Sequence, residues 1–242
     1  FDYLGEPTPY NVEWPARSSY FGIIDLCGIP KDRYFLYQSK WTDKEVLHLL
    51  PHWNWDDGQN VSVHCYTSFD KGELFLNGKS LGVREKDASE LYTTYRLVWD
   101  DISYEPGELK VVALNENNNQ LKETVIKTAG EPAKIVLEAD RTEITADGKE
   151  LAFVTVSVVD ENGTLCPQAN NLIHFSVEGE GSVKAVGNGD PTSLESFVEP
   201  FRKTFNGKCM VLVQSSKTAS EITLKAKSEG LEPREIRIKT ST

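Results

Sequence analysis

The sequence is poor in the residues that most often build metal and disulfide sites. Its 242 residues include only four cysteines and four histidines. The cysteines form no CxxC pair and have no histidine at ligand spacing, so neither a zinc site nor a dense disulfide framework is expected. We predict free, mostly buried thiols, and no metal or cofactor. The four cysteines are Cys27, Cys65, Cys166 and Cys209.

Basic charge and long apolar runs are also scarce. The 26 basic residues are outnumbered by 37 acidic ones, and the formal net charge of −11 repels phosphate backbones and anionic lipid headgroups. No stretch approaches the roughly 18 to 20 apolar residues that cross a bilayer, and no signal-peptide pattern opens the chain. Nucleic-acid binding and membrane insertion are therefore not expected. The length favours two packed units, because one domain usually has about 100 to 150 residues.

Motifs for nucleophilic catalysis, calcium or phosphate are missing as well. No serine or cysteine stands in an elbow motif with a base, and the aspartates do not recur at the spacing of a calcium loop. The glycine-rich stretch 187–190 follows no βα unit, which favours a turn over a phosphate cradle. Pro51 argues against the regular helix that would align His48 and His52 on a metal.

The first 45 residues are rich in aromatic residues and proline, which is typical of a long ordered loop. The opening stretch, residues 1–5, looks like the end of a buried strand, so we expect the chain to start inside a folded structure. After Pro30, the spacing of Tyr34, Tyr37 and Trp41 predicts a helix over 31–41. We expect this helix to dock through these three aromatic side chains.

From residue 46 to 128 apolar residues alternate with polar ones, which indicates strands. Asn77-Gly78 stands between two apolar arms and predicts a tight hairpin over 73–83, because a type I′ turn needs positive φ at both central residues. Residues 115–120 are polar and predict a loop tip. The residues 130–132, Gly-Glu-Pro, resemble a linker.

Beyond residue 132 the sequence predicts a second β domain. Short apolar segments are separated by Asp-Gly and Asn-Gly turns, and six or seven strands at this spacing are typical of an immunoglobulin-like sandwich. The Cys…Trp…Cys signature of true immunoglobulin domains is absent. The segments span residues 135–139, 152–159, 172–177, 209–213, 222–226 and 236–238.

Three motifs in order along the chain resemble glycoside hydrolase family 2 β-galactosidases of Bacteroides-type bacteria. The opening FDYLGEPTPY resembles the last strand and following loop of the catalytic TIM barrel, and PKDRYFLYQS (30–39) resembles its final helix. HLLPHWNW (48–55) with ELFLNGKSLG (73–82) is similar to the β-sandwich that follows the barrel. GNGDPT (187–192) with FRKTFNG (201–207) is similar to the terminal immunoglobulin-like domain.

The resemblance implies three parts and a mainly β fold. Residues 1–45 would be the end of a TIM barrel, 46–130 a β-sandwich domain, and 131–242 an immunoglobulin-like β-sandwich domain. Family 2 enzymes retain configuration with two glutamates on barrel strands, and such carboxyls stand about 5 to 5.5 Å apart. Both would precede Phe1, so we expect no catalytic residue in this chain and no activity of the chain alone.

The parent enzyme that the resemblance implies hydrolyses terminal β-galactosides or a related β-glycoside. The partner of this chain would be the catalytic barrel of the same polypeptide, which the two sandwiches would buttress while shaping the rim of its cleft. The family also contains glucuronidases and mannosidases. A secreted or periplasmic bacterial protein is expected, and the sandwiches are candidates for forming a homo-oligomer.

The candidate substrate-proximal residues belong to the loop after the last barrel strand, because such loops form the active-site face of a barrel. In the parent enzyme, the resemblance implies that Asp2, Tyr3, Glu6, Trp14 and Arg17 reach the pocket. In the competing interpretation, which we favour, Asp2 and Glu6 brace the loop backbone while Tyr3 and Trp14 pack beneath it.

Trp53 and Trp55 are candidates for sugar stacking, since an aromatic face binds the apolar side of a pyranose. The competing interpretation, which we favour, is that they wedge the barrel segment onto the first sandwich.

Two other classes of function remain open at this point. A stand-alone carbohydrate-binding or adhesin-like module would need an exposed aromatic platform or a calcium site on one sandwich. A plain interaction scaffold would need a large apolar patch and would self-associate.

Overall fold

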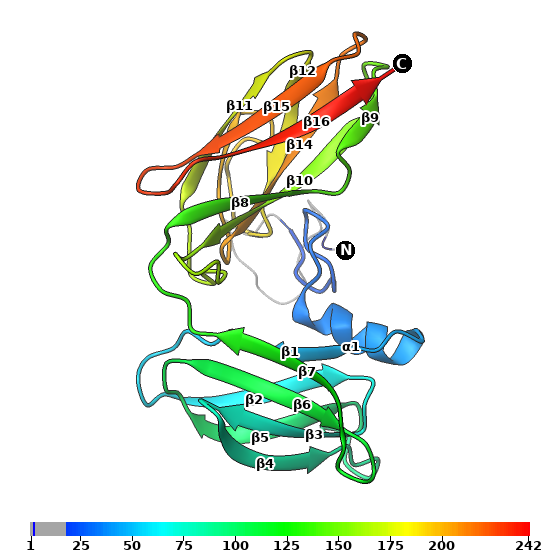
Figure 1. Cartoon of the computed structure of the whole chain (residues 1–242), viewed down its shortest axis with the longest axis vertical. Coiled ribbons are helices and arrows are strands. Elements are labelled where there is room, and N and C mark those ends of the chain that lie inside the picture. Colours follow the sequence, from blue (N-terminus) through cyan, green and yellow to red (C-terminus); the bar gives the residue numbers. More distant parts are fainter. Residues whose placement is uncertain (1, 3–17) are drawn as a thin grey trace. The chain divides into compact units, whose positions relative to one another are not determined.

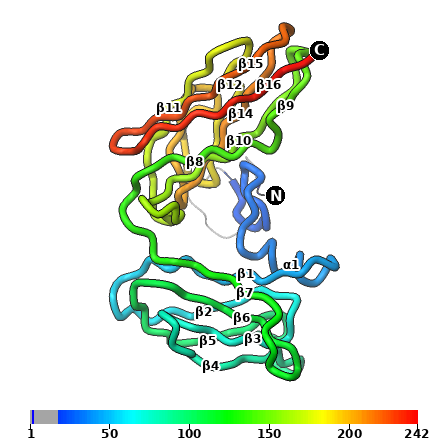
Figure 2. The backbone as a smooth tube through the Cα atoms, in the orientation of Figure 1, coloured from blue at the N-terminus to red at the C-terminus, as the bar shows by residue number. Residues whose placement is uncertain are grey.

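A computed structural model of the chain describes residue 2 and residues 18–242. The described residues form two compact units. The first unit is Pro30–Ala129, and the second unit contains the described residues up to Ile29 together with Gly130–Thr242. The chain therefore passes from the second unit into the first at residue 30 and returns at residue 130, and Figure 2 traces both passages. Residues of the predicted barrel segment 1–45 are consequently divided between the two units.

The first unit is a β-sandwich with one helix (Figure 1). One sheet has three strands in the order β1-β2-β5, and the other has four in the order β4-β3-β6-β7, all paired antiparallel. The elements are α1 (Asp32–Trp41), β1 (Leu47–Leu50), β2 (Asn60–Thr67), β3 (Lys71–Leu76), β4 (Lys79–Glu85), β5 (Arg96–Ser103), β6 (Glu108–Leu114) and β7 (Gln120–Lys127).

Helix α1 confirms the helix predicted over 31–41, but the expected docking residues are partly wrong. Trp41 is 75% exposed and does not dock. Phe35 instead stacks on His48 of β1 with ring centroids 3.9 Å apart, and Ser39, one turn later, is the buried residue of the helix. Positions i and i+4 share a helix face, so the face that packs on the sheet contains Phe35 and Ser39. It lies next to the face of Tyr34, Tyr37 and Trp41 that the sequence predicts.

The predicted hairpin is confirmed. Asn77 and Gly78 link β3 to β4 with φ values of 50° and 80°, the left-handed conformations of a type I′ turn. The Asn77 side chain has a second role, because it accepts a hydrogen bond from the Glu108 N–H at 2.9 Å and donates one to the Pro106 carbonyl at 3.1 Å. A single residue thereby fixes both the hairpin and the turn that leads into β6.

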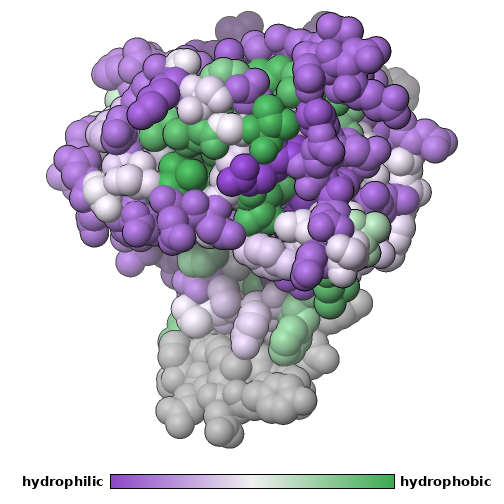
Figure 3. Space-filling view, turned by 90° about the horizontal axis from the view of Figure 1, so that it is seen from below, coloured by the Kyte–Doolittle hydropathy of each residue, from purple (hydrophilic) through white to green (hydrophobic). Residues whose placement is uncertain are grey.

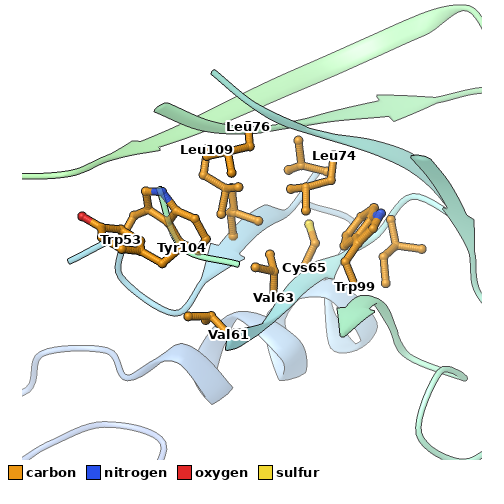
Figure 4. Packing of buried hydrophobic residues seen from close by; sticks show 12 residues of the cluster. Trp53, Val61, Val63, Cys65, Leu74, Leu76, Trp99, Tyr104 and Leu109 are labelled. Carbon is orange, nitrogen blue, oxygen red and sulfur yellow. The ribbon is translucent and has the colours of Figure 1, made fainter. Parts of the chain in front are cut away.

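The core of the first unit lies between its two sheets and contains two buried tryptophans (Figure 4). The indole of Trp53 donates a hydrogen bond to the Glu105 carbonyl, and that of Trp99 donates one to the Gly82 carbonyl. Both N–H groups are thus satisfied, as burial requires. The cluster consists of Leu49, Trp53, Val61, Val63, Cys65, Leu74, Leu76, Leu97, Trp99, Tyr104, Leu109 and Val111.

The second unit is a sandwich of a four-stranded sheet, β12-β14-β10-β8, and a five-stranded sheet, β13-β11-β15-β16-β9. All of its pairings are antiparallel except that of β16 with β9. The strands are β8 (Lys134–Ala139), β9 (Glu143–Thr145), β10 (Leu151–Val159), β11 (Leu172–Glu178), β12 (Gly181–Gly187), β13 (Phe201–Lys203), β14 (Lys208–Ser215), β15 (Glu221–Lys227) and β16 (Arg234–Ser241).

The six strands that the sequence predicts in this unit are present, but the expected total of six or seven is too low. The three additional strands are β9, β12 and β13. Two of them have only three residues, too few to show an alternation, and β12 begins and ends with glycine. A mainly β fold is nevertheless correct for the whole described chain.

The surface of the molecule mixes polar and apolar side chains. On the face shown in Figure 3, small groups of apolar side chains alternate with polar ones. Within residues 2 and 18–242, no helix combines the length and apolar character that a membrane span requires.

Candidate functional site

The described N-terminal residues fold back on themselves through two aspartates. Asp2 is buried; its N–H donates to the Ile24 carbonyl at 2.9 Å, and its Oδ1 accepts from the Gly22 N–H at 2.8 Å. This placement agrees with the interpretation that Asp2 braces loop backbone. Whether Asp2 also lies near a substrate pocket in a complete enzyme stays a prediction.

Asp25 closes the turn that follows. Its Oδ1 accepts hydrogen bonds from the N–H groups of Cys27 at 2.8 Å and Ile29 at 2.9 Å, and its own N–H donates to the Ile29 carbonyl at 3.0 Å. Gly28, with φ of 82°, supplies the left-handed residue that the turn needs. The turn presents the thiol of Cys27 and the carboxylate of Asp25 to the second sandwich.

Two glycines of the second sandwich receive this turn. A Cβ placed on Gly187, at the end of β12, would lie 2.8 Å from the Cys27 sulfur, and one on Gly189 would clash with the Asp25 carboxylate. Real Cβ atoms do not tolerate such distances, so both positions need glycine for close approach. The predicted turn at 187–190 is thus the receptor for residues 25–29.

The surroundings of the Cys27 thiol favour its protonated form. Burial raises its pKa to about 12, the charge of Asp25 acts in the same direction, and the charge of Arg202 opposes both. A thiol with such a pKa holds little of the nucleophilic thiolate form at neutral pH. All four cysteines are free, and three of them are buried, which confirms the sequence prediction.

Arg202 anchors the loop that carries the two glycines. Its side chain is 1% exposed, and its Nη2 donates to Asn188 Oδ1 at 2.9 Å while its Nη1 donates to the Glu195 carbonyl at 3.1 Å. The Glu195 carboxylate lies 3.7 Å from Nε, and the guanidinium lies 5.1 Å from the centre of the Phe197 ring. Asn188 in turn donates to the Lys203 carbonyl at 2.9 Å. The network fixes residues 188–203 from inside the unit.

The sequence alone does not predict this site. The resemblance places the stretches 187–192 and 201–207 in the terminal domain but gives no role to Gly187 or Arg202. A Gly-x-Gly stretch next to an apolar strand indicates close backbone approach. What approaches it, the turn at Cys27, lies 160 residues upstream (187 − 27) and could not be found from local pattern.

Four of the five predicted substrate-proximal residues lie outside the described residues. They are Tyr3, Glu6, Trp14 and Arg17.

The two tryptophans that are candidates for sugar stacking both pack on the core of the first sandwich. Trp53 is 1% exposed inside the first sandwich, with its ring 5.2 Å from that of Tyr104, so neither of its faces is open to a sugar. It belongs to the sandwich core and is not a wedge against another part. Trp55 is half-buried against the same core, stacks on the His52 ring at 4.6 Å and donates its N–H to the His52 carbonyl. Both histidine–tryptophan contacts follow from the turn at 52–55.

Within residues 2 and 18–242, no three histidine, cysteine, aspartate or glutamate side chains gather in a way that could hold a metal ion.

Two segments of the chain match the sequence profiles of known protein families. Residues 135–237 match the profile described as glycoside hydrolase family 2 C-terminal domain 5. The second sandwich is therefore a C-terminal domain of glycoside hydrolase family 2. Residues 58–122, in the first sandwich, match a domain of unknown function, DUF4982. The recognised resemblance to family 2 is thereby confirmed.

Relatives of known sequence extend the similarity over both units. The chain is 53% identical over 96% of its length to the β-galactosidase BoGH2A of Bacteroides ovatus, of which it spans 26%. It is 30% identical over 89% of its length to a putative β-glucuronidase of Formosa agariphila, of which it spans 21%. The chain thus corresponds to about a quarter or less of each of these family 2 relatives.

Solved structures agree with this assignment. A β-glycosidase from Bacteroides vulgatus is similar over 98% of the chain with a TM-score of 0.88 and 36% identity, and the match covers 30% of that protein. A family 2 member from Bacteroides cellulosilyticus matches the whole chain with a TM-score of 0.90 and 32% identity, over 35% of its own length. The arrangement of strands described above is therefore that of the C-terminal sandwiches of family 2 proteins.

Proposed function

We propose that this chain is the non-catalytic C-terminal part of a retaining, β-galactosidase-like family 2 glycoside hydrolase. In this role the second sandwich braces the segment that leads out of the catalytic barrel and thereby supports the rim of the substrate cleft. The observation that carries the proposal is the seating of residues 25–29 on Gly187 and Gly189. The family match supports it, since it assigns the receptor side of this contact to a C-terminal domain.

The contact has the properties that a brace requires. It is steric, because a glycine backbone meets a sulfur and a carboxylate, and it rests on a loop that the buried Arg202 holds in place. Packed interiors transmit small displacements instead of absorbing them. A displacement of residues 25–29 would therefore be resisted by the whole second sandwich.

In the complete enzyme, the pair of glutamates would be supplied by barrel strands that precede this segment. Retaining hydrolysis needs two carboxyls about 5 to 5.5 Å apart, and such a separation depends on neighbouring strands of a closed barrel. Asp2, Tyr3, Glu6, Trp14 and Arg17 are proposed to border the cleft, with Asp2 acting through the loop backbone that it holds. A secreted or periplasmic protein remains part of the proposal.

The substrate class proposed for the complete enzyme is a terminal β-galactoside. The 53% identity to a β-galactosidase supports this choice over a β-glucuronide, because three relatives named β-glucuronidase or putative β-glucuronidase are 26%, 28% and 30% identical.

A hydrolysis assay tests the non-catalytic role. The purified chain is incubated with nitrophenyl β-galactoside and nitrophenyl β-glucuronide, with the complete B. ovatus β-galactosidase as positive control. We expect no release of nitrophenol above the buffer blank. Turnover that co-purifies with the chain through two different columns would show that the chain has its own active site, and the proposal would be wrong.

A further inference from the structure

A cluster of cationic and aromatic side chains lies on the face of the β1-β2-β5 sheet opposite to the core residues Cys65 and Leu97. Its centre is Arg96, at the start of β5. The Arg96 guanidinium lies 5.7 Å from the ring centre of Tyr66 on β2 and 5.3 Å from that of Tyr92. These distances are within cation–π range, so both rings hold the guanidinium in a defined position.

His64, a neighbour of Arg96 on the same face, completes the cluster. Its Nε2 lies 3.3 Å from the Tyr92 hydroxyl, and the two rings meet edge to face at 5.7 Å. Burial and then the charge of Arg96 lower the pKa of His64, while the charge of Asp100 opposes them. His64 is therefore neutral at pH 7. Asp100 itself is held by the Ser62 hydroxyl.

Two buried nitrogen atoms of this cluster have no hydrogen-bond partner. They are Arg96 Nε and His64 Nδ1. Arg96 Nε always carries a proton, and His64 Nδ1 carries one when the Tyr92 hydroxyl donates to His64 Nε2. Among the described residues, Arg202 is the other arginine whose Nε is buried without a hydrogen bond, but the Glu195 carboxylate lies 3.7 Å from it, whereas no carboxylate forms an ion pair with Arg96. Arg96 therefore carries a positive charge that no ion pair or hydrogen bond within the described residues compensates.

The loop before β5 adds exposed rings, and the end of α1 adds a positive charge. Leu91, Tyr92 and Tyr95 are 84%, 49% and 46% exposed. The Lys40 ammonium, at the end of α1, lies 5.4 Å from the ring centre of Tyr95. Lys40 is also close enough to Lys86 to lower the pKa of that lysine, an effect second to burial. Three basic side chains, Lys40, Lys86 and Arg96, thus lie around this loop, which itself carries Asp87 and Glu90.

We propose that this surface, the Arg96 patch formed by Lys40, His64, Tyr92, Tyr95 and Arg96, binds an acidic sugar of the uronic acid class. The planar guanidinium matches the geometry of a carboxylate. The exposed tyrosine rings offer apolar faces to the C–H side of a pyranose. A simple inorganic anion would contact the arginine but not the tyrosine rings. An acidic sugar can contact both, so it fits the patch better. The patch is independent of the proposed catalytic role of the complete enzyme.

A pair of ligands that differ at one carbon tests this proposal. Methyl galacturonide carries a carboxylate at C6 where methyl galactoside carries a hydroxymethyl group. The intact chain is titrated with each and followed by NMR and calorimetry, with sodium phosphate as a third ligand. We expect the uronide to bind with a dissociation constant at least 10-fold lower than the galactoside, and binding to weaken as salt is raised. Equal affinity for the two sugars, tighter binding of phosphate, or no binding of the uronide at 20 mM would overturn the proposal.

Variants locate the site. Arg96→Gln is expected to weaken uronide binding at least 10-fold, and Tyr95→Ala at least threefold. Tyr95 is half-exposed at the surface, so this variant tests the patch even where loss of Arg96 disturbs folding. Arg84→Gln is the matched control, because Arg84 lies on β4 and its guanidinium bonds only the neighbouring Val83 carbonyl. Uronide binding unchanged in both patch variants, with thermal unfolding like that of the parent chain, would contradict the assignment.

Discussion

The two units hold their N-terminal attachments in different ways. The first unit holds α1 through the Phe35–His48 ring stack and a solvent-accessible contact, in which Asp32 and His48 meet at 2.8 Å with side chains 57% and 26% exposed. The second unit holds residues 25–29 through close packing on Gly187 and Gly189, supported by the fully buried Arg202. An accessible ion pair is worth little, whereas a packed contact over a buried charge is not easily broken. The second attachment is therefore the one suited to transmit position.

The junction at residue 130 repeats this contrast. The first unit binds Ala129 with a neutral side chain, since the Asn54 amide accepts from its N–H at 2.9 Å and donates to its carbonyl at 2.8 Å. The second unit binds the N–H of Gly130 with the carboxylate of Asp160, which is 3% exposed. Ala129 is thus held by a neutral amide and Gly130 by a carboxylate. Because only the carboxylate titrates, only the Gly130 contact depends on pH.

The largest expected effect is that of Arg202→Ala. This change leaves Asn188 Oδ1 and the Glu195 carbonyl without their buried donor and removes the ion pair with the Glu195 carboxylate, and we expect a loss of about 3 kcal/mol in the unfolding free energy of the second unit. Urea unfolding followed by circular dichroism, which reports the strands of the second unit, measures it. Arg237→Ala is the control, because Arg237 is 67% exposed and pairs with Glu221 at 3.8 Å; it is expected to cost less than about 1 kcal/mol. Equal costs for the two variants would remove the contrast between buried and accessible contacts.

Asp160→Asn is expected to have an intermediate, pH-dependent effect. Burial raises the pKa of Asp160, but hydrogen bonds from the N–H groups of Gly130, Thr164 and Asn162 outweigh it, so the pKa lies below its ordinary value. A carboxyl with a depressed folded-state pKa stabilises above its unfolded pKa of about 3.9, and the stabilisation is lost as pH falls through the folded value. At pH 7 the variant should lose about 1 to 2 kcal/mol.

The difference between the parent chain and Asp160→Asn should shrink from pH 7 to pH 3, as measured by urea unfolding at each pH. Asn54→Ala, which removes the neutral clamp on Ala129, should destabilise the first unit by a similar amount at both pH values. A pH-independent effect at Asp160 would show that its charge is not what binds Gly130.

The smallest expected effect is that of Asp32→Asn. Removing the charge from the accessible pair with His48 should change the unfolding free energy of the first unit by less than about 1 kcal/mol, and still less at high salt. The Phe35–His48 stack remains in the variant. A loss comparable with that of Arg202→Ala, in the same urea experiment, would mean that both attachments are equally firm.

The features that could be predicted from sequence are those set by neighbouring residues. The hairpin depends on Asn77 and Gly78 adopting positive φ, which two adjacent residue types decide. The limits of α1 follow from Pro30 before it and the aromatic spacing within it. Long alternating strands such as β10 and β14 were also visible as apolar segments.

The features that could not be predicted depend on contacts distant in sequence. The assignment of residues 18–29 to the second unit rests on Gly187 and Gly189, which no local pattern connects to Cys27. The burial of Trp53 depends on the turn at Glu105, which accepts its indole N–H. The three-residue strand β9 pairs in parallel with β16, the last strand of the described chain. No turn connects the two strands directly, so no local signal predicts this pairing.

The central claim is that the second sandwich holds residues 25–29 in place, and a double-mutant cycle at Cys27 and Gly187 tests it most directly. The added Cβ of Gly187→Ala would meet the Cys27 sulfur, and overpacking of this kind costs about 1 to 3 kcal/mol. Chymotryptic cleavage after the exposed Tyr20 and Phe21, together with urea unfolding, reports the loosening. We predict faster cleavage and lower stability in Gly187→Ala, and recovery of both when Cys27→Ala removes the sulfur. Equal effects of Gly187→Ala with and without the Cys27 sulfur would contradict the account.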